Sequence, residues 1–211
     1  MARDLAVMRI SLDALKKAAK TADGTVNDAY LAVVTGGLRS YHERHGTAVQ
    51  YLRAVVPISL RIAHDTGWGN KITLMRLTVP AGEPDPAARM RLLHRITQAA
   101  REERSLPVTG AIAAALNTLP VGYVAAILKH ADFVASNVPG VPMPVYVAGS
   151  KVTGMSAFGP TIGTALNTTL VSYAGTCDIG INIDTAAVPD PDVLLACLEE
   201  SAAEIKACGG E

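Results

Sequence analysis

Two short polar motifs contain the residues of this chain best suited to chemistry. Asn137 ends an apolar stretch and is followed by Val138, Pro139 and Gly140. Proline holds the residue before it in an extended conformation and Pro-Gly favours a type II turn, so Asn137 should end a strand abruptly. Its amide could then donate a hydrogen bond to developing negative charge, as in an oxyanion site. The more common alternative is that Asn137 only satisfies backbone groups of the turn.

The second motif opens a predicted helix. Thr25 is a candidate N-cap, and Asp28 three residues later completes a capping box with Asp in place of the usual Glu. Capping and a favourable interaction with the helix dipole explain Asp28 without any chemistry. The alternative is that Asn27 and Asp28 face a cleft. The candidate site residues are therefore those of both motifs: Asn27, Asp28, Asn137, Pro139 and Gly140.

The histidines and Ser156 do not form a recognisable catalytic set. His42 and His45 have near-metal spacing, but no Cys or carboxylate cluster completes a metal site. His130, just before an uncharged tract, is the best candidate base among them. Ser156 lacks the glycine spacing of a nucleophile elbow. We predict no catalytic residue and no metal site, and we rank an independent hydrolase using His130 or Ser156 last.

Composition restricts the class of protein. A chain of 211 residues is long enough for one large domain. It contains no run of about 20 apolar residues, so we expect no transmembrane helix. Three cysteines without CxxC spacing and a start without a signal-peptide pattern favour a reduced, cytoplasmic setting. Nine aromatic residues are too few to suggest a base-stacking surface, so we expect no nucleic-acid partner.

Charge is unevenly distributed along the chain. Residues 1–104 hold 16 of the 19 Lys and Arg but 10 of the 19 Asp and Glu, a net +6, and residues 105–211 have a net −6. A basic half could attract phosphates of a nucleotide-like cofactor or a lipid headgroup. We favour the simpler interpretation, that the early helices expose more surface than the later strands.

One long tract is nearly free of charge. The forty-five residues from Phe133 to Cys177 contain only Lys151. Repeated Gly and Pro exclude a single helix, and the tract is too polar for a membrane span. We expect interior strands and tight turns packed against apolar material, either the rest of the fold or a lipid substrate.

The pattern of apolar residues predicts one mixed α/β domain over residues 1–211, with a sheet covered by helices. Helices are predicted for 12–20, 25–46, from Asp85 onward and from Asp190 to about 209, with two short buried helices in 105–128. Strands are predicted for 52–60, 72–79, 133–137, 145–153 and 170–183, the last being one strand or a hairpin without an obvious turn. In the third long helix the expected inner stripe is Met90, Leu93, Thr97 and Ala100, and the side chains expected to stay in water are Arg89, Arg91, Arg95 and Arg101.

In their order along the chain, these landmarks resemble the C-terminal lobe of the bacterial wax ester synthase/diacylglycerol acyltransferase family. The resemblance extends from about residue 3 to 206 and rests on segments 25–28, 56–61, 69–70, 136–140, 144–149, 166–167, 172–175 and 189–190. It implies the C-terminal half of a chloramphenicol-acetyltransferase-like fold, with the active site in a tunnel between two lobes. The five candidate residues would then line that tunnel or position its wall.

The chain departs from the family pattern in ways that affect function. Val141 replaces a second proline, and a motif His-His-x-x-x-Asp-Gly is missing from the 211 residues. The resemblance places that motif in the N-terminal lobe, with its second histidine as the general base that activates an alcohol to attack an acyl-CoA thioester. Residues 65–69, Asp-Thr-Gly-Trp-Gly, echo a motif of related plant acyltransferases but precede 136–140 instead of following it, so we interpret them as a coincidence.

Two functions of different class follow from the resemblance. The first is the C-terminal half of an acyl-CoA-dependent O-acyltransferase making triacylglycerol or wax esters, with acyl-CoA as co-substrate, no permanent cofactor and the N-terminal lobe supplied by a separate chain. An apolar lining suits this role because each methylene of an acyl chain that it removes from water contributes about 0.8 kcal/mol of favourable transfer free energy. The alternative is a non-catalytic lipid- or partner-binding module, or an inactive truncated remnant. An unpartnered interlobe face would drive self-association, and contact with a membrane or lipid droplet would be peripheral.

Overall fold

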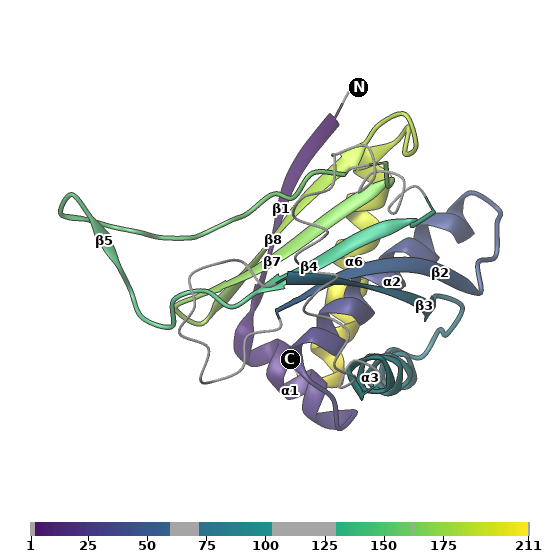
Figure 1. The fold of residues 1–211 in the computed structure, drawn as a ribbon, viewed down its shortest axis with the longest axis horizontal. Coiled ribbons are helices and arrows are strands. Elements are labelled where there is room, and N and C mark those ends of the chain that lie inside the picture. Colours follow the sequence, from purple (N-terminus) through teal and green to yellow (C-terminus); the bar gives the residue numbers. More distant parts are fainter. Residues whose placement is uncertain (1–2, 60–71, 103–129, 162, 211) are drawn as a thin grey trace.

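A mixed six-stranded sheet forms the centre of the molecule (Figure 1). The computed structural model describes residues 3–59, 72–102, 130–161 and 163–210. The strand order is β1-β8-β7-β4-β2-β3, in which β2, β4 and β7 are parallel and the other neighbouring pairs are antiparallel. The strand bounds are β1 (Arg3–Ser11), β2 (Tyr51–Ser59), β3 (Ile72–Pro80), β4 (Phe133–Val138), β7 (Leu166–Tyr173) and β8 (Thr176–Asp184).

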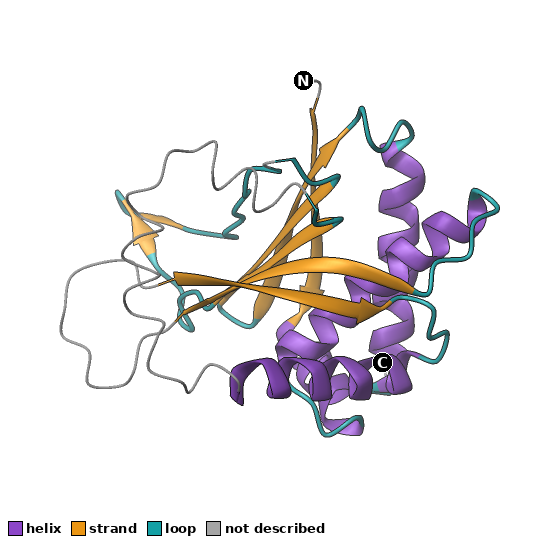
Figure 2. Cartoon of the chain, turned by 45° about the vertical axis from the view of Figure 1, so that its right-hand side comes forward, coloured by secondary structure: helices purple, strands orange, loops and turns teal. Residues whose placement is uncertain are grey.

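The long helices gather on one face of this sheet (Figure 2). Their bounds are α1 (Leu12–Thr21), α2 (Val26–Arg44), α3 (Pro86–Glu102) and α6 (Pro191–Cys208). These elements confirm the predicted mixed α/β class and the four helices predicted within the described residues. None of the helices in the described ranges is long and apolar enough to cross a membrane.

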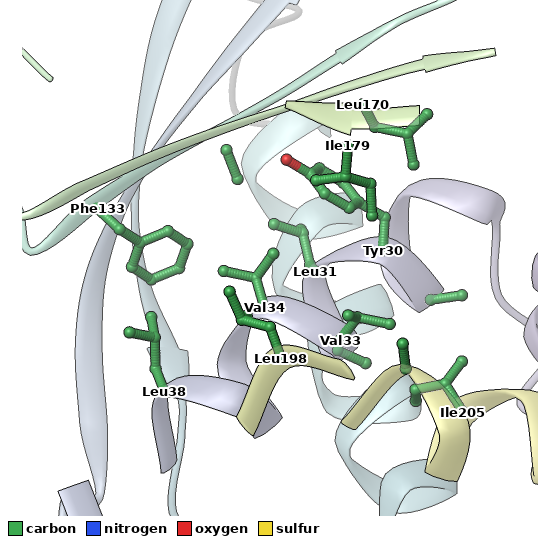
Figure 3. Packing of buried hydrophobic residues seen from close by; sticks show 14 of the residues in the cluster. Tyr30, Leu31, Val33, Val34, Leu38, Phe133, Leu170, Ile179, Leu198 and Ile205 are labelled. Atoms are coloured by element: carbon green, nitrogen blue, oxygen red, sulfur yellow. The ribbon is translucent and has the colours of Figure 1, made fainter. Parts of the chain in front are cut away.

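Helix α2 lies at the centre of the core, between the sheet and α6 (Figure 3). The helix begins at the predicted capping box, in which Thr25 and Asp28 exchange hydrogen bonds with each other's backbone N–H. Its residues from Asp28 to Leu38 are all buried. The apolar side chains of this stretch pack against Phe133 and Leu170 of the sheet and against Leu198 and Ile205 of α6. Burial on every side explains why this stretch of α2 shows no polar face in the sequence.

Two features of the predicted strands need correction, and one alternative left open by the sequence is decided. Residues 3–11 form β1 although no strand was predicted there, because its outward face also contains apolar residues, Leu5 and Val7, that mask the alternation. The run 170–183, predicted as one strand or a hairpin, is the hairpin. Its first strand, β7, begins earlier than predicted, at Leu166, and the chain turns into β8 at Ala174 and Gly175 with φ of 46° and 89°. This is the geometry of a type I′ turn, and alanine in the first position hides the usual Asn-Gly signal.

The predicted interior strand 145–153 is also wrong. Residues 145–152 form a projecting arm, in which β5 (Tyr146–Val147) pairs only with β6 (Ser150–Lys151) (Figure 1). Tyr146 and Val147 are 65% and 66% exposed, so this part of the uncharged tract is not interior. The base of the arm is held by the Tyr173 hydroxyl, which accepts from Val145 N and donates to Val152 O.

The next part of the tract, residues 154–160, crosses the sheet face opposite the helices. Asn182 and Asn167 donate from Nδ2 to the carbonyl oxygens of Gly159 and Pro160, each at 2.9 Å. These side-chain amides explain how an uncharged, irregular segment is held to the sheet without helix or strand hydrogen bonds.

Arg89 is the clearest error in the predicted helix faces. It is completely buried, and its guanidinium donates to the carbonyl oxygens of Ala32 at 3.1 Å and Glu83 at 2.9 Å. Burial lowers the pKa of Arg89, although the carboxylate of Glu204 lies 3.5 Å away. The remaining expected exposed residues of this helix, Arg91, Arg95 and Arg101, are exposed. The predicted short helices in 105–128 lie outside the described residues.

Replacing Gly37 by alanine should destabilise the protein, because α6 approaches α2 closely at this position. A Cβ at Gly37 would lie 2.8 Å from the Cα of Leu198. Overpacking against backbone should lower the free energy of unfolding by about 2 kcal/mol, outweighing the helix propensity gained. Urea unfolding of Gly37→Ala measures this, with Ser40→Ala on the same helix as control. A Gly37→Ala variant as stable as wild type would contradict the close packing.

The C-terminal end of α2 should contribute stability that depends on pH. His45 Nε2 lies 2.9 Å from Asp190 Oδ2, and a hydrogen bond with the Tyr41 carbonyl, together with Asp190, raises the pKa of His45 above 6.5. A raised pKa stabilises the fold below the unfolded pKa, and this stabilisation is lost as pH rises through the folded pKa. His45→Gln should therefore destabilise the protein more at about pH 5.5 than at about pH 8 in urea unfolding. Equal losses at both pH values would show that protonation of His45 does not matter.

Candidate functional site

A cavity of about 270 Å³ lies where the parallel strands β2 and β4 end. The residues that line it come from the first turn of α2, strands β2 and β3, the last turns of α3, and the end of β4 with the turn that follows: Asn27, Val56, Pro57, Met75, Thr97, Arg101, Asn137 and Pro139. The carboxyl ends of parallel strands are the usual place for ligands in open α/β sheets. The cavity therefore defines the candidate site.

The predicted candidates Asn27, Asn137 and Pro139 meet in this cavity, although 110 residues separate the two asparagines. Asn137 Nδ2 lies 3.5 Å from Asn27 Oδ1, at the long limit of a hydrogen bond. Each carboxamide has two donor hydrogens and one acceptor oxygen, so each can bind a ligand in addition to making this contact. Asn137 lies at the end of β4 as predicted, on the same face as the helices.

Asp28 lies behind the cavity and not in its wall. Its carboxylate is 1% exposed and accepts hydrogen bonds from Thr25 N and Thr25 Oγ1, each at 2.8 Å. Two further donors come from α3: His94 Nδ1 at 2.8 Å and Thr97 Oγ1 at 2.9 Å. Asp28 therefore caps α2, as the capping box predicts, and also ties α2 to α3. Sequence reasoning missed His94, because nothing in the sequence shows that these two helices meet there.

Gly140, in the turn after β4, packs against the neighbouring strand β7. Its backbone N donates to Ser172 Oγ at 3.1 Å, and a Cβ at this position would lie 2.0 Å from the carbonyl oxygen of Ser172. Gly140 is not among the residues with positive φ, so the predicted type II turn is wrong. Glycine is needed here for close approach of two backbones, not for a left-handed conformation.

The cavity combines an apolar lining with few polar groups, a common composition for small-molecule sites. Val56, Pro57 and Met75 supply apolar surface, and Arg101 near the end of α3 supplies positive charge. A guanidinium can bind a phosphate or carboxylate with two parallel hydrogen bonds. The wall is therefore suited to an amphipathic ligand with an anionic or ester-like polar end.

The other residues considered for catalysis lie elsewhere. His130 lines a different cavity of about 220 Å³ on the opposite face of β2 and β3, with Arg53 and Arg76. Ser156 donates to Asp178 Oδ2 at 3.0 Å within the segment that crosses the sheet. Burial raises the pKa of Cys177 to about 11, which makes it a poor nucleophile. Among the described residues, no three His, Cys, Asp or Glu side chains gather as a metal-binding group, and residues 65–69 lie outside the described ranges.

The same fold is found in a known acyltransferase and in a condensation domain. The solved wax ester synthase/diacylglycerol acyltransferase from Marinobacter aquaeolei VT8 superposes with a TM-score of 0.76 at 24% identity, over all of this chain and 50% of that chain. The starter condensation domain of rhizomide synthetase superposes with a TM-score of 0.62 at 14% identity, over 99% of this chain and 45% of that chain. These likenesses confirm the expected chloramphenicol-acetyltransferase-like fold.

Sequence comparison identifies the family. Residues 68–206 match the model of the WS/DGAT C-terminal domain. A candidate diacylglycerol O-acyltransferase of Mycobacterium tuberculosis H37Rv is 37% identical over 204 residues, covering 95% of this chain and 42% of that protein. A second candidate of the same strain is 34% identical over 220 residues, covering 99% and 48%. The chain belongs to the WS/DGAT C-terminal domain family, and it spans about half the length of these relatives.

Replacing Gly140 by alanine should disturb both the fold and the candidate site. The added methyl group must displace the turn after β4 or the end of β7, because the nearest atom is backbone. We expect a loss of about 2 kcal/mol in the free energy of unfolding, measured by urea unfolding. Val141→Ala, which keeps the backbone hydrogen bond from Ala174 N to Val141 O, is the matched control. Equal stability of both variants would show that the turn has room to move.

Proposed function

We propose that this chain forms the C-terminal half of an acyl-CoA-dependent O-acyltransferase that esterifies a diacylglycerol or a long-chain alcohol. The observation that supports this most is the meeting of Asn27, Asn137 and Pro139 in one cavity at the strand ends. Membership of the WS/DGAT C-terminal domain family supplies the reaction class. Acyl-CoA is the co-substrate in this proposal, and the cavity forms one wall of the site in which the two substrates meet.

The chemistry divides between two halves of the enzyme. The alcohol oxygen attacks the thioester carbonyl, a base takes the alcohol proton, and the tetrahedral intermediate collapses to the ester with release of the CoA thiol. The chain lacks His-His-x-x-x-Asp-Gly, so the proposal assigns the base to an N-terminal lobe. The side chains of Asn27 and Asn137 would donate hydrogen bonds to the oxygen that becomes negative. Arg101 would bind an anionic part of the co-substrate.

The exposed arm, together with Met143 just before it, is the proposed contact with that N-terminal lobe. Met143, Tyr146 and Val147 are each about two-thirds exposed, at 64%, 65% and 66%. Neighbouring exposed apolar side chains of this size are typical of an interaction surface. Relatives of twice the length, in which this chain matches about half, support an N-terminal lobe as the occupant.

The second candidate function is a lipid- or partner-binding module without catalysis. The described lining of the cavity favours it, since none of these residues is a strong general base. The two functions differ in what a partner does. Under the first, adding an N-terminal lobe that contains the motif produces acyl transfer. Under the second, the chain alone binds lipid and no partner produces transfer.

Asn137→Ala should lower acyl transfer without unfolding the chain. Removing one donor from an oxyanion site typically costs about a hundredfold in kcat. The assay combines the chain with a motif-containing N-terminal lobe and measures transfer from long-chain acyl-CoA to diacylglycerol and hexadecanol. Ser136→Ala, one residue earlier on the same strand, is the control and should keep its activity. Full activity of Asn137→Ala would remove Asn137 from the site, and unfolding with no separable loss of activity would make it structural.

A further inference from the structure

His94 is a polar residue near the cavity to which the proposed mechanism gives no role. It lies on α3, three residues before Thr97 and seven before Arg101, so the three side chains follow one side of the helix. Thr97 and Arg101 line the cavity. The His94 side chain is 25% exposed and its Nδ1 lies 2.8 Å from Asp28 Oδ2.

The partner of His94 determines which ring nitrogen bears the hydrogen. Asp28 Oδ2 already accepts from Thr25 N and Thr25 Oγ1. An ionised carboxylate can only accept, so the contact requires a hydrogen on Nδ1. Nδ1–H can donate whether the ring is neutral or protonated, and the neutral ring is then held as the Nδ1–H tautomer.

The same carboxylate links the two sides of the cavity. Asn27, which lines the wall, directly precedes Asp28 on the first turn of α2. Thr97, which lines the opposite part of the wall, donates to the other oxygen of Asp28 at 2.9 Å. Because Asp28 is almost completely buried, a lost donor cannot be replaced freely by water. The position of Asn27 relative to α3 therefore depends on the donors that hold Asp28.

We propose that His94 is a positioning residue of this cavity. Its Nδ1–H anchors Asp28, and through Asp28 it holds the Asn27 carboxamide at the distance from α3 and from Asn137 that the site requires. His94 does not itself touch the substrate. The effect of His94 on the reaction rate rests on the proposed acyltransferase function, whereas its effect on the position of Asn27 does not.

Paired substitutions separate positioning from simple stability. His94→Asn keeps an N–H donor at the place of Nδ1, whereas His94→Leu keeps bulk but removes the donor. Gln98→Asn and Gln98→Leu, at an exposed position one turn later, control for the effect of each residue type on the helix. The readout is the side-chain amide resonances of Asn27 and Asn137 in ¹H–¹⁵N spectra of the full chain. We expect His94→Leu to shift both sets of resonances, and His94→Asn and both Gln98 variants to leave them in place.

The wild-type protein provides a test that does not depend on any variant folding. In ¹⁵N spectra of the imidazole ring, neutral His94 should show a protonated Nδ1, and a protonated Nε2 would overturn the proposal. Unchanged Asn27 resonances in His94→Leu would also overturn it, because the contact would then stabilise the helices without positioning the wall. If His94→Asn shifted the resonances as much as His94→Leu, the ring and not its Nδ1–H would be responsible.

The kinetic test uses the chain combined with its N-terminal lobe. His94→Leu should lower kcat by about tenfold through misplacement of Asn27, with His94→Asn restoring most of the rate. A wild-type mixture that transfers no acyl group would refute the proposed function, while the amide and tautomer measurements would still decide the role of His94. An active mixture in which His94→Leu transfers at the wild-type rate would overturn the positioning role alone.

Discussion

Burial of α2 is the constraint on which the rest of the structure depends. This helix, buried from Asp28 to Leu38, packs against the sheet on one side and against α3 and α6 on its other sides. Gly36 and Gly37 make this possible. A Cβ at Gly36 would collide with Arg89 and Ser201, and a Cβ at Gly37 would collide with Leu198. Close approach of α3 and α6 then fixes where the first turn of α2 lies, and the candidate site is built at that turn.

Two buried charged side chains lie where α2 packs against its neighbouring helices, and their hydrogen-bond partners differ. Arg89 is held by backbone carbonyl oxygens and Glu204, which makes it a structural cation at the centre of three helices. Asp28 is held by donors from its own capping box and from α3, next to the cavity. Buried charge is costly unless every polar atom is paired, so both residues fix relative helix positions strongly. Asp28 alone transmits that rigidity to the cavity wall.

The uncharged tract has three structural roles that composition could not separate. Its first part is strand β4 and the turn that brings Pro139 to the cavity; its middle is the exposed β5–β6 arm; and residues 154–160 cross the open face of the sheet. Absence of charge is compatible with a buried strand, with a surface that another protein covers, and with a segment held by amide side chains. Only the neighbours of each part distinguish these cases.

Elements with local signals could be predicted from the sequence. The capping box at Thr25 and Asp28, the helix start at Pro86, the abrupt end of β4 after Asn137 and the mixed α/β class all follow from short-range sterics and hydrogen bonding. The tertiary structure alone decided what depends on distant segments: the meeting of Asn27 with Asn137, the pairing of His94 with Asp28, the burial of Arg89 and the need for glycine beside Ser172. Each of these contacts joins residues far apart in the chain, and no local pattern specifies which helix or strand will lie beside another.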